Sequence, residues 1–165
     1  MNKINRKVEY ALIGLKAMVA KRPGELTSAK EISLVYGAPF EVMSRVMQTL
    51  VQQGVLRSEQ GAHGGYQIMR DLTRLSFFEL HEMVLGQLAL AKCIDGDEEG
   101  GCEMRGTCNI VSPVHNLNKK LAAFYRSLSI AELLETHASK MSSQRSPKQQ
   151  AVMKTQNSIE KEAGL

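Results

Sequence analysis

The sequence predicts a mainly α-helical protein: a winged helix-turn-helix with a small β-hairpin wing, followed by a long dimerisation helix. Three observations support this fold class. Two short amphipathic segments, at residues 28–37 and 39–54, are joined by a glycine-containing turn, which is typical of a helix-turn-helix. Two short β-type segments around a glycine-rich loop follow directly. An apolar stripe with alternating spacings of four and three then runs from Ile110 to Leu128.

Composition and charge narrow the class of protein. The chain has 165 residues, a net charge of +4 and three cysteines. The odd cysteine count, and an N-terminal stretch without an apolar signal core, favour a reducing, cytoplasmic setting. No apolar run approaches the roughly 18 residues of a membrane span, so no membrane partner is expected. Residues 1–75 carry eleven Lys and Arg against six Asp and Glu, whereas residues 76–137 carry five against nine. A basic first part favours a phosphate-binding surface.

The first helix is predicted to start at an Asn5 cap and to run to about residue 20. Its expected inner face is Val8, Leu12, Leu15 and Val19. Arg6 and Lys7 occupy its first turn, where their charges oppose the helix dipole. Either a DNA phosphate offsets that conflict or both cations are simply solvated.

The next two helices form the predicted helix-turn-helix. Ser28 and Glu31 make a capping box for the second helix, and Gly37 ends it. Pro39 suits the first position of the third helix. The inner face of the third helix is expected to be Met43, Val46, Met47 and Leu50.

The third helix would enter the major groove of DNA with its N-terminal residues. Arg45 can pair with guanine, Glu41 can accept from cytosine, and Phe40 can touch a thymine methyl group. Glycines in the wing allow close approach to a phosphate chain. Each of these residues can equally belong to a solvated surface. The predicted DNA-contacting residues of these elements are Ser28, Pro39, Phe40, Glu41, Ser44, Arg45, Gly64 and Gly65.

All three cysteines lie between residues 93 and 108, in the pattern C-x8-C-x5-C. Glycines separate them and no apolar run is present to bury them, so the thiols can converge on a soft metal centre. A structural zinc held by Cys93, Cys102, Cys108 and His115 is one interpretation. An enzyme, such as a thiol oxidoreductase, is not expected, because the chain lacks C-x-x-C and any recognisable cofactor loop.

The helices around the cysteine loop have their own signals. Ser76 and Glu79 form a second capping box, and His81 on that helix is expected to be hydrogen-bonded rather than a ligand. After the loop, Ser112 is the expected cap of the long helix. Its apolar stripe consists of Ile110, Val114, Leu117, Leu121, Phe124 and Leu128. A two-fold dimer through this stripe is favoured over packing on its own domain, because the small winged helix offers limited surface.

Four stretches carry a resemblance to a known family: Tyr10-Ala11-Leu12, Glu31-Ile32-Ser33, Gly61-x-x-Gly64-Gly65-Tyr66 and the three-cysteine loop. Together they resemble the bacterial winged-helix regulators that include the iron–sulfur regulator IscR, the nitric-oxide sensor NsrR and the iron regulator RirA. The resemblance covers about residues 1–137. It implies a homodimeric regulator that binds a palindromic operator on double-stranded DNA. An iron–sulfur cluster, 4Fe-4S favoured over 2Fe-2S, would control that binding in response to nitric oxide, redox state or iron.

The resemblance also implies a ligand set. Cys93, Cys102 and Cys108 match the cluster thiolates, and the last two are spaced most like the NsrR loop. Val111 stands where IscR has a ligand histidine. Glu9 of the partner subunit, at a position where NsrR uses an aspartate, is therefore favoured as fourth ligand, ahead of water or a small thiol. Glu9 can equally be an ordinary surface carboxylate.

The wing departs from the family pattern at one position. Gln60 replaces the arginine that usually enters the minor groove, so Arg57 or His63 would substitute for it. The predicted organisation is a DNA-binding region at 1–75, the cluster loop and dimerisation helices at 76–137, and a flexible tail at 138–165. A winged-helix regulator with structural zinc, or with cluster-free thiol sensing, remains the alternative.

Overall fold

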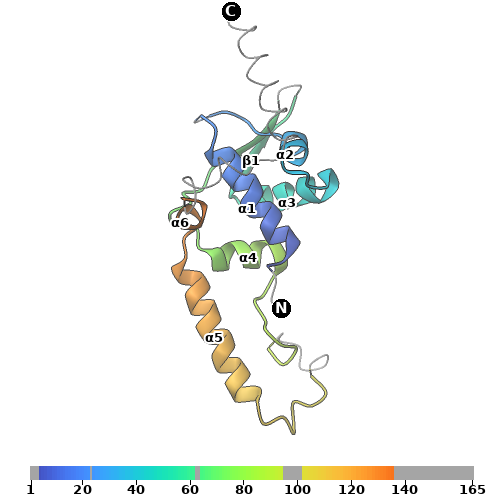
Figure 1. Cartoon of the computed structure of the whole chain (residues 1–165), viewed down its shortest axis with the longest axis vertical. Coiled ribbons are helices and arrows are strands. Elements are labelled where there is room, and N and C mark those ends of the chain that lie inside the picture. The colour runs from blue at the N-terminus through green and yellow to red at the C-terminus, as the bar shows by residue number, and fades with distance from the viewer. Residues whose placement is uncertain (1–3, 23, 62–63, 95–101, 136–165) are drawn as a thin grey trace, which may run out of the picture.

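The computed structural model describes residues 4–22, 24–61, 64–94 and 102–135 (Figure 1). The predicted tail at 138–165, His63 and residues 95–101 of the cysteine loop lie outside them. The elements are α1 (Arg6–Val19), α2 (Ala29–Tyr36), α3 (Phe40–Gln52), β1 (Leu56–Glu59), β2 (Gly65–Ile68), α4 (Phe77–Leu85), α5 (Val111–Ser127) and α6 (Ile130–Glu135). The predicted fold class, a mainly α winged helix-turn-helix with a further long helix, is confirmed.

The predicted start of α1 is confirmed, because the Asn5 side chain accepts a hydrogen bond of 2.9 Å from the Lys7 backbone nitrogen. The buried face of the helix, however, is centred on Ala11, Leu15 and Met18. The prediction that Val19 faces inward is wrong: it is exposed at the last helical position, at the edge of that face.

The capping box predicted for α2 forms on one side only. The Ser28 hydroxyl accepts a hydrogen bond from the Glu31 backbone nitrogen at 3.1 Å, as expected. The Glu31 carboxylate instead pairs with the Lys21 ammonium at 2.8 Å, which ties the end of α1 to the start of α2. Gly37 ends the helix with a φ of 68°, a left-handed conformation that favours glycine.

The inner face predicted for α3 is confirmed: Met43, Val46, Met47 and Leu50 are all buried. Pro39 is the N-cap of this helix rather than its first residue. The wing follows as the antiparallel pair β1–β2, with Arg57 opposite Gln67. Thr27, just before α2, bridges to Tyr66 of β2 through two backbone hydrogen bonds, so the wing is anchored to the helix-turn-helix.

The apolar core of the winged helix-turn-helix, here called the head, extends beyond residue 75. Leu80 of α4 and Ile130 and Leu134 of α6 belong to the same buried cluster as the inner faces of α1 and α3. The Ile130 backbone nitrogen also donates to the Leu75 carbonyl at 2.8 Å. The functional division at residue 75 therefore stays a prediction.

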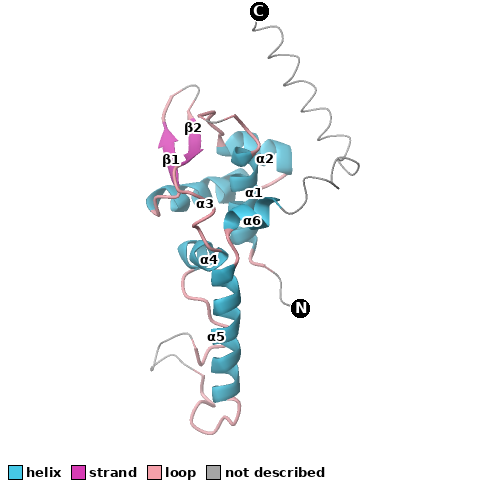
Figure 2. Cartoon of the chain, turned by 90° about the vertical axis from the view of Figure 1, so that its left-hand side faces the viewer, coloured by secondary structure: helices cyan, strands magenta, loops and turns pink. Residues whose placement is uncertain are grey.

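Helix α5 projects away from this head as a stalk, with its N-terminal end farthest from the wing (Figures 1 and 2). Phe77 of α4 packs edge-on against Tyr125 of α5, with ring centroids 4.7 Å apart. The Arg126 guanidinium lies 3.7 Å from the centre of the Phe78 ring, a cation–π contact. Among the described helices, none has the length and apolarity needed to cross a membrane.

The start of α5 differs from the expectation. The helix begins at Val111 with Ile110 as N-cap and without a side-chain cap, so the prediction of Ser112 as cap is wrong. By contrast, the capping box predicted for α4 forms on both sides, between Ser76 and Glu79. Hydrogen bonds from Ser76 and the guanidinium of Arg70 hold the pKa of Glu79 below its usual value.

These two helix starts generate a matched prediction. Ser76→Ala removes a cap that is used and should lower the free energy of unfolding by about 1 kcal/mol. Ser112→Ala removes an exposed hydroxyl that caps nothing and should change it by less than about 0.5 kcal/mol. Chemical denaturation of both variants measures the difference. Equal losses would contradict the assignment of the two caps.

Candidate nucleic-acid interface and cysteine site

The first turns of α3 present a polar surface opposite its buried face. Pro39, Phe40, Glu41 and Arg45 are exposed, and Ser44 is half-buried at one side of the surface. Glu41 and Arg45 are four residues apart and therefore lie on the same face of the helix. The structure thus brings together the predicted base-contacting residues of α3 on one accessible surface.

Sequence reasoning missed Gln48 on the same surface. Its side chain is exposed, and its amide nitrogen donates to the Tyr66 hydroxyl at 3.1 Å, linking α3 to the wing. The signal was available: Glu41, Arg45, Gln48 and Gln52 follow the helical spacing of 4, 3 and 4. An amide at this position can both hold the wing and read a base edge.

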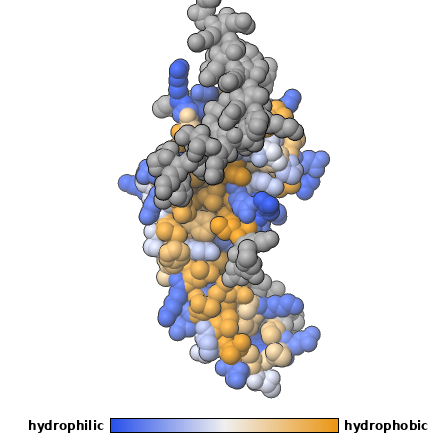
Figure 3. All heavy atoms as spheres, in the orientation of Figure 1, coloured by the Kyte–Doolittle hydropathy of each residue, from blue (hydrophilic) through white to orange (hydrophobic). Residues whose placement is uncertain are grey.

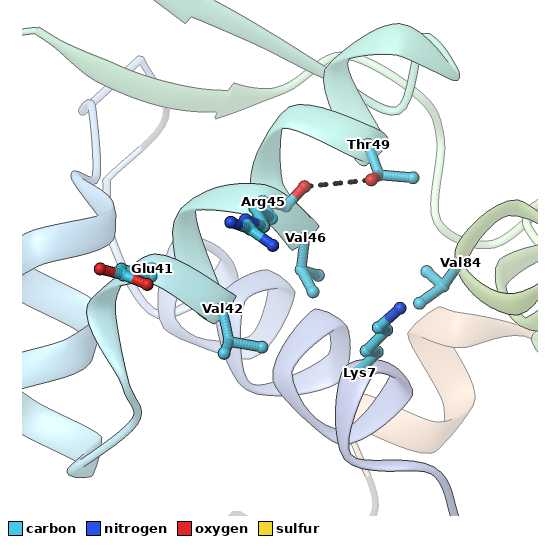
Figure 4. A pocket seen from close by; sticks show the side chains of 7 residues that line it. All are labelled: Lys7, Glu41, Val42, Arg45, Val46, Thr49 and Val84. Atoms are coloured by element: carbon cyan, nitrogen blue, oxygen red, sulfur yellow. Dashed lines mark hydrogen bonds between the residues drawn. The ribbon is translucent and has the colours of Figure 1, made fainter.

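A hollow of about 200 Å³ lies beside this surface, between α1, α3 and α4 (Figure 4). It is lined by Lys7, Glu41, Val42, Arg45, Val46, Thr49 and Val84. Lys7 comes from α1, and within the described residues it makes no ion pair. Arg6 differs, because its guanidinium pairs with the Glu9 carboxylate at 2.8 Å. Of the two cations at the start of α1, Lys7 is therefore the one placed beside the exposed surface of α3.

In the wing, Arg57 is held in place by two neighbours. Its Nε donates to the Gln67 side chain at 2.9 Å, and its Nη2 lies 3.1 Å from a carboxylate oxygen of Glu59. All three side chains lie on the hairpin, and Arg57 is half exposed. This arrangement orders Arg57 along the hairpin rather than leaving it free in solvent.

The two wing glycines, Gly64 and Gly65, lie very close to backbone atoms of the same chain. A Cβ on Gly64 would lie 2.4 Å from the Glu59 carbonyl oxygen, and a Cβ on Gly65 would lie 3.0 Å from the Thr27 backbone. The first contact closes the hairpin turn, and the second seats the hairpin against the start of α2. Both glycines therefore permit close backbone approaches within the chain that a side chain would obstruct.

The three cysteines are all free and half-buried. Cys93 ends the segment that leaves α4, whereas Cys102 and Cys108 lie on a compact turn just before α5. That turn is held by backbone hydrogen bonds from Arg105 to Cys102 and from Thr107 to Met104. Within the described residues, no three His, Cys, Asp or Glu side chains gather closely enough to hold a metal ion.

The donor set nevertheless suits a thiolate-bound group in its chemistry. Three free thiols on segments attached to one helix are the ligand type that iron–sulfur clusters and soft metals require. The two other residues predicted as metal ligands are Glu9 and His115. Glu9 is engaged with Arg6 in its own chain, and His115 is half-buried on α5. The three thiols therefore match an iron–sulfur cluster in ligand type, but within the described residues they do not lie close enough together to bind one.

His81 differs from the expectation. It is half-buried on α4, 6.4 Å from the Tyr125 ring between ring centroids, and its Nδ1 is buried without a hydrogen-bond partner in the described residues. Burial lowers the pKa of His81, against the opposing effects of the Glu82 charge and the Gly86 backbone. Burial thus favours the neutral form of the imidazole, which lies near Tyr125 at the α4–α5 contact.

Comparison with known proteins agrees with this architecture. The Rrf2 family, described as iron-dependent transcriptional regulators, matches residues 4–136. The transcriptional regulator NsrR of Bacillus subtilis is 26% identical over 126 residues, which are 74% of this chain and 81% of that protein.

Solved structures share the fold. CymR, the global cysteine regulator of B. subtilis, superimposes with a TM-score of 0.61 at 17% identity, covering 81% of this chain and 97% of that one. IscR of T. potens does so with a TM-score of 0.56 at 19% identity, covering 81% and 86%. Since the family match spans nearly all of the described chain, this protein belongs to the Rrf2 family and is a DNA-binding transcriptional regulator.

Proposed function

We propose that this chain is a cytoplasmic, non-enzymatic homodimeric regulator whose cysteine-held iron–sulfur cluster controls binding to a palindromic operator. The observation that carries the proposal is the position of α5. Both cysteine-bearing segments meet this helix, and Ile110, Leu117 and Phe124 of its apolar stripe are exposed. A group bound by the three thiols would therefore restrict the position of α5, the helix through which two subunits would pair.

The uncovered stripe supports the dimer. Ile110, Leu117 and Phe124 are 55%, 58% and 56% exposed, and apolar side chains line the stalk in Figure 3. The helix packs on its own chain mainly by a different face, through Asn118, Ala122 and Tyr125, and Leu121 at the edge of the stripe also contacts this cluster. At 3.6 residues per turn, that face is rotated from the stripe by roughly 100°. The alternative in which the stripe packs on its own domain is thereby disfavoured.

A second copy of this chain suits the stripe for two reasons. A two-fold axis would place the same apolar residues on both sides of the contact, so one stripe covers the other. Burying such side chains contributes roughly 25 cal/mol per Å² of apolar surface removed from water. The pairing would also set the distance between two recognition helices, which determines the half-site spacing of an operator.

For the cluster, the proposed ligands are the thiolates of Cys93, Cys102 and Cys108, with 4Fe-4S favoured over 2Fe-2S. Such a group, when bound, supplies a centre sensitive to nitric oxide, oxygen and iron supply. Glu9 of the partner subunit remains the proposed fourth ligand. The start of α1 lies at the junction of head and stalk, whereas the cysteine-bearing segments lie along the stalk (Figure 1). This separation favours a carboxylate from the other subunit over one from the same chain.

On DNA, Arg45 and Glu41 would read base edges in the major groove while Lys7 contacts a backbone phosphate beside them. Arg57, ordered by Glu59 and Gln67, would approach the minor groove from the wing. A coupling of about 1–3 kcal/mol between the state of the thiols and operator affinity would change binding roughly 5- to 150-fold. Such a range is sufficient for a switch.

The DNA interface predicts different effects for two cations. With an operator selected from random duplexes, Arg45→Ala should weaken binding by about 1–3 kcal/mol and relax specificity at one base pair. Lys7→Ala should weaken binding to all sequences alike and lower the salt dependence by about one unit. Binding titrations at several salt concentrations measure both. Lys119→Ala on the stalk removes the same charge and should have no effect; full specificity in Arg45→Ala would refute its base contact.

The cysteine site predicts a cofactor that anaerobic purification retains. The protein should be brown, with iron and acid-labile sulfide, and its visible absorption should change on addition of nitric oxide. Serine at any of the three cysteine positions should abolish this absorption, and Glu9→Gln should alter the spectrum without preventing iron binding. Colourless protein containing one zinc per chain would refute the cluster and support the zinc alternative.

A second candidate function has its own support. All three thiols are free, and the described residues do not assemble them around a metal ion. A cluster-free regulator that senses oxidants through these thiols would purify without metal, and its DNA binding would change reversibly with oxidant and reductant. The same anaerobic preparation therefore separates the two candidates.

The apolar stripe predicts the oligomeric state. Leu117→Glu places a charge in the proposed contact and should convert the dimer to a monomer in sedimentation experiments. Ala123→Glu introduces the same charge at an exposed position on the other side of α5 and should leave the dimer intact. A monomeric wild-type protein, or a dimeric Leu117→Glu variant, would rule out this interface.

A further inference from the structure

The segment that leads from α4 to Cys93 is hydrogen-bonded to the middle of α5 through the side chain of Asn118. The Asn118 amide nitrogen donates to the Leu88 carbonyl at 3.1 Å, and the Leu90 backbone nitrogen donates to the Asn118 amide oxygen at 3.1 Å. The Asn118 side chain therefore acts as a hydrogen-bond donor through its nitrogen and as an acceptor through its oxygen. These bonds connect residues 28 and 30 positions apart in the sequence.

Further contacts fix the two sides of Cys93. Leu88 is buried with Phe78 and Ala122, so an apolar contact accompanies the Asn118 bonds. Beyond Cys93, Ile94 is buried and its backbone nitrogen donates to the Ala91 carbonyl at 2.9 Å. Cys93 therefore lies on a short turn between a point held by α5 and a buried side chain.

The other two cysteines are placed differently. Cys102 and Cys108 lie on a turn whose backbone hydrogen bonds are local, and this turn leads directly into α5 at Val111. Asn118 lies seven residues further along α5, which corresponds to about 10 Å along the helix axis. One helix thus positions both cysteine-bearing segments, one through the chain itself and the other through Asn118.

We propose that Asn118 is the positioning residue for the Cys93 thiol: it holds residues 88–90 on α5 and thereby sets the place of Cys93 relative to the Cys102–Cys108 turn. This inference rests on the proposed function in one respect, namely that the three thiols act together. Without the Asn118 side chain, the Leu88 carbonyl and the Leu90 backbone N–H would form hydrogen bonds with water instead. The Leu88 side chain would then be the remaining contact that holds the segment on α5.

The test measures each thiol separately in the reduced, full-length apoprotein. Timed alkylation with iodoacetamide, followed by peptide mass spectrometry, gives one rate for each cysteine. Asn118→Ala should raise the rate at Cys93 several-fold while the rates at Cys102 and Cys108 stay at wild-type values. Asn118→Asp keeps the acceptor for the Leu90 amide and loses the donor to Leu88, so its Cys93 rate should fall in between.

Asn116→Ala is the matched control, because it removes the same amide from an exposed position of the same helix. Its three rates should equal those of the wild type. Equal Cys93 rates in Asn118→Ala and Asn116→Ala would overturn the proposal. An equal acceleration of all three cysteines would overturn it too, because it would show a general loosening of the fold.

A second readout connects the residue to the proposed cluster. In protein reconstituted with iron and sulfide, Asn118→Ala should lose its visible absorption to a chelator several-fold faster than Asn116→Ala, and equal rates would refute the link between Asn118 and the bound group. If the wild type takes up no iron, the proposed cluster fails while the alkylation experiment still decides the role of Asn118. The two failures are therefore distinguishable.

Discussion

The packing of α5 against α4 is the contact on which the other functional features depend. It consists of the Phe77–Tyr125 ring pair and the Arg126–Phe78 cation–π contact, together with buried Ala122. Because α4 is itself part of the core of the head, this contact sets the direction of the stalk relative to α3. The position of the cysteine-bearing segments and the orientation of the apolar stripe both follow from it.

Charge and apolar surface are separated along the molecule, and pairing within the chain decides which charges are available. Arg6 is neutralised by Glu9, and Arg57 is ordered by Glu59, whereas Lys7 and Arg45 border the hollow beside α3 without ion pairs in the described residues. A phosphate chain is attracted most by cations whose charge is not already compensated. The stalk instead exposes Leu117 and Phe124, which favours association with another apolar surface over association with DNA.

Local signals predicted most of the local structure, with the Ser112 cap as an exception, and the errors at Val19 and Glu31 arose where residues of another segment decided the outcome. The Ser76 cap, the left-handed Gly37 and the buried face of α3 depend on residues close in sequence, and all were predicted. Val19 was misassigned because the buried face of α1 depends on what packs against it. Glu31 was expected to complete a capping box, but Lys21, two residues after the end of α1, offers its carboxylate an opposite charge, which a neutral backbone amide does not.

The sequence by itself determined the fold class, the buried and exposed faces of α3 and the presence of three thiols in one loop, because periodicity, capping and cysteine spacing are local properties of a chain. Only the tertiary structure decided which face of α5 is covered by its own chain, that Gly65 is needed against Thr27, and that Asn118 holds the segment leading to Cys93. Those contacts join residues far apart in sequence, and no local pattern encodes which distant backbone group will meet a given side chain.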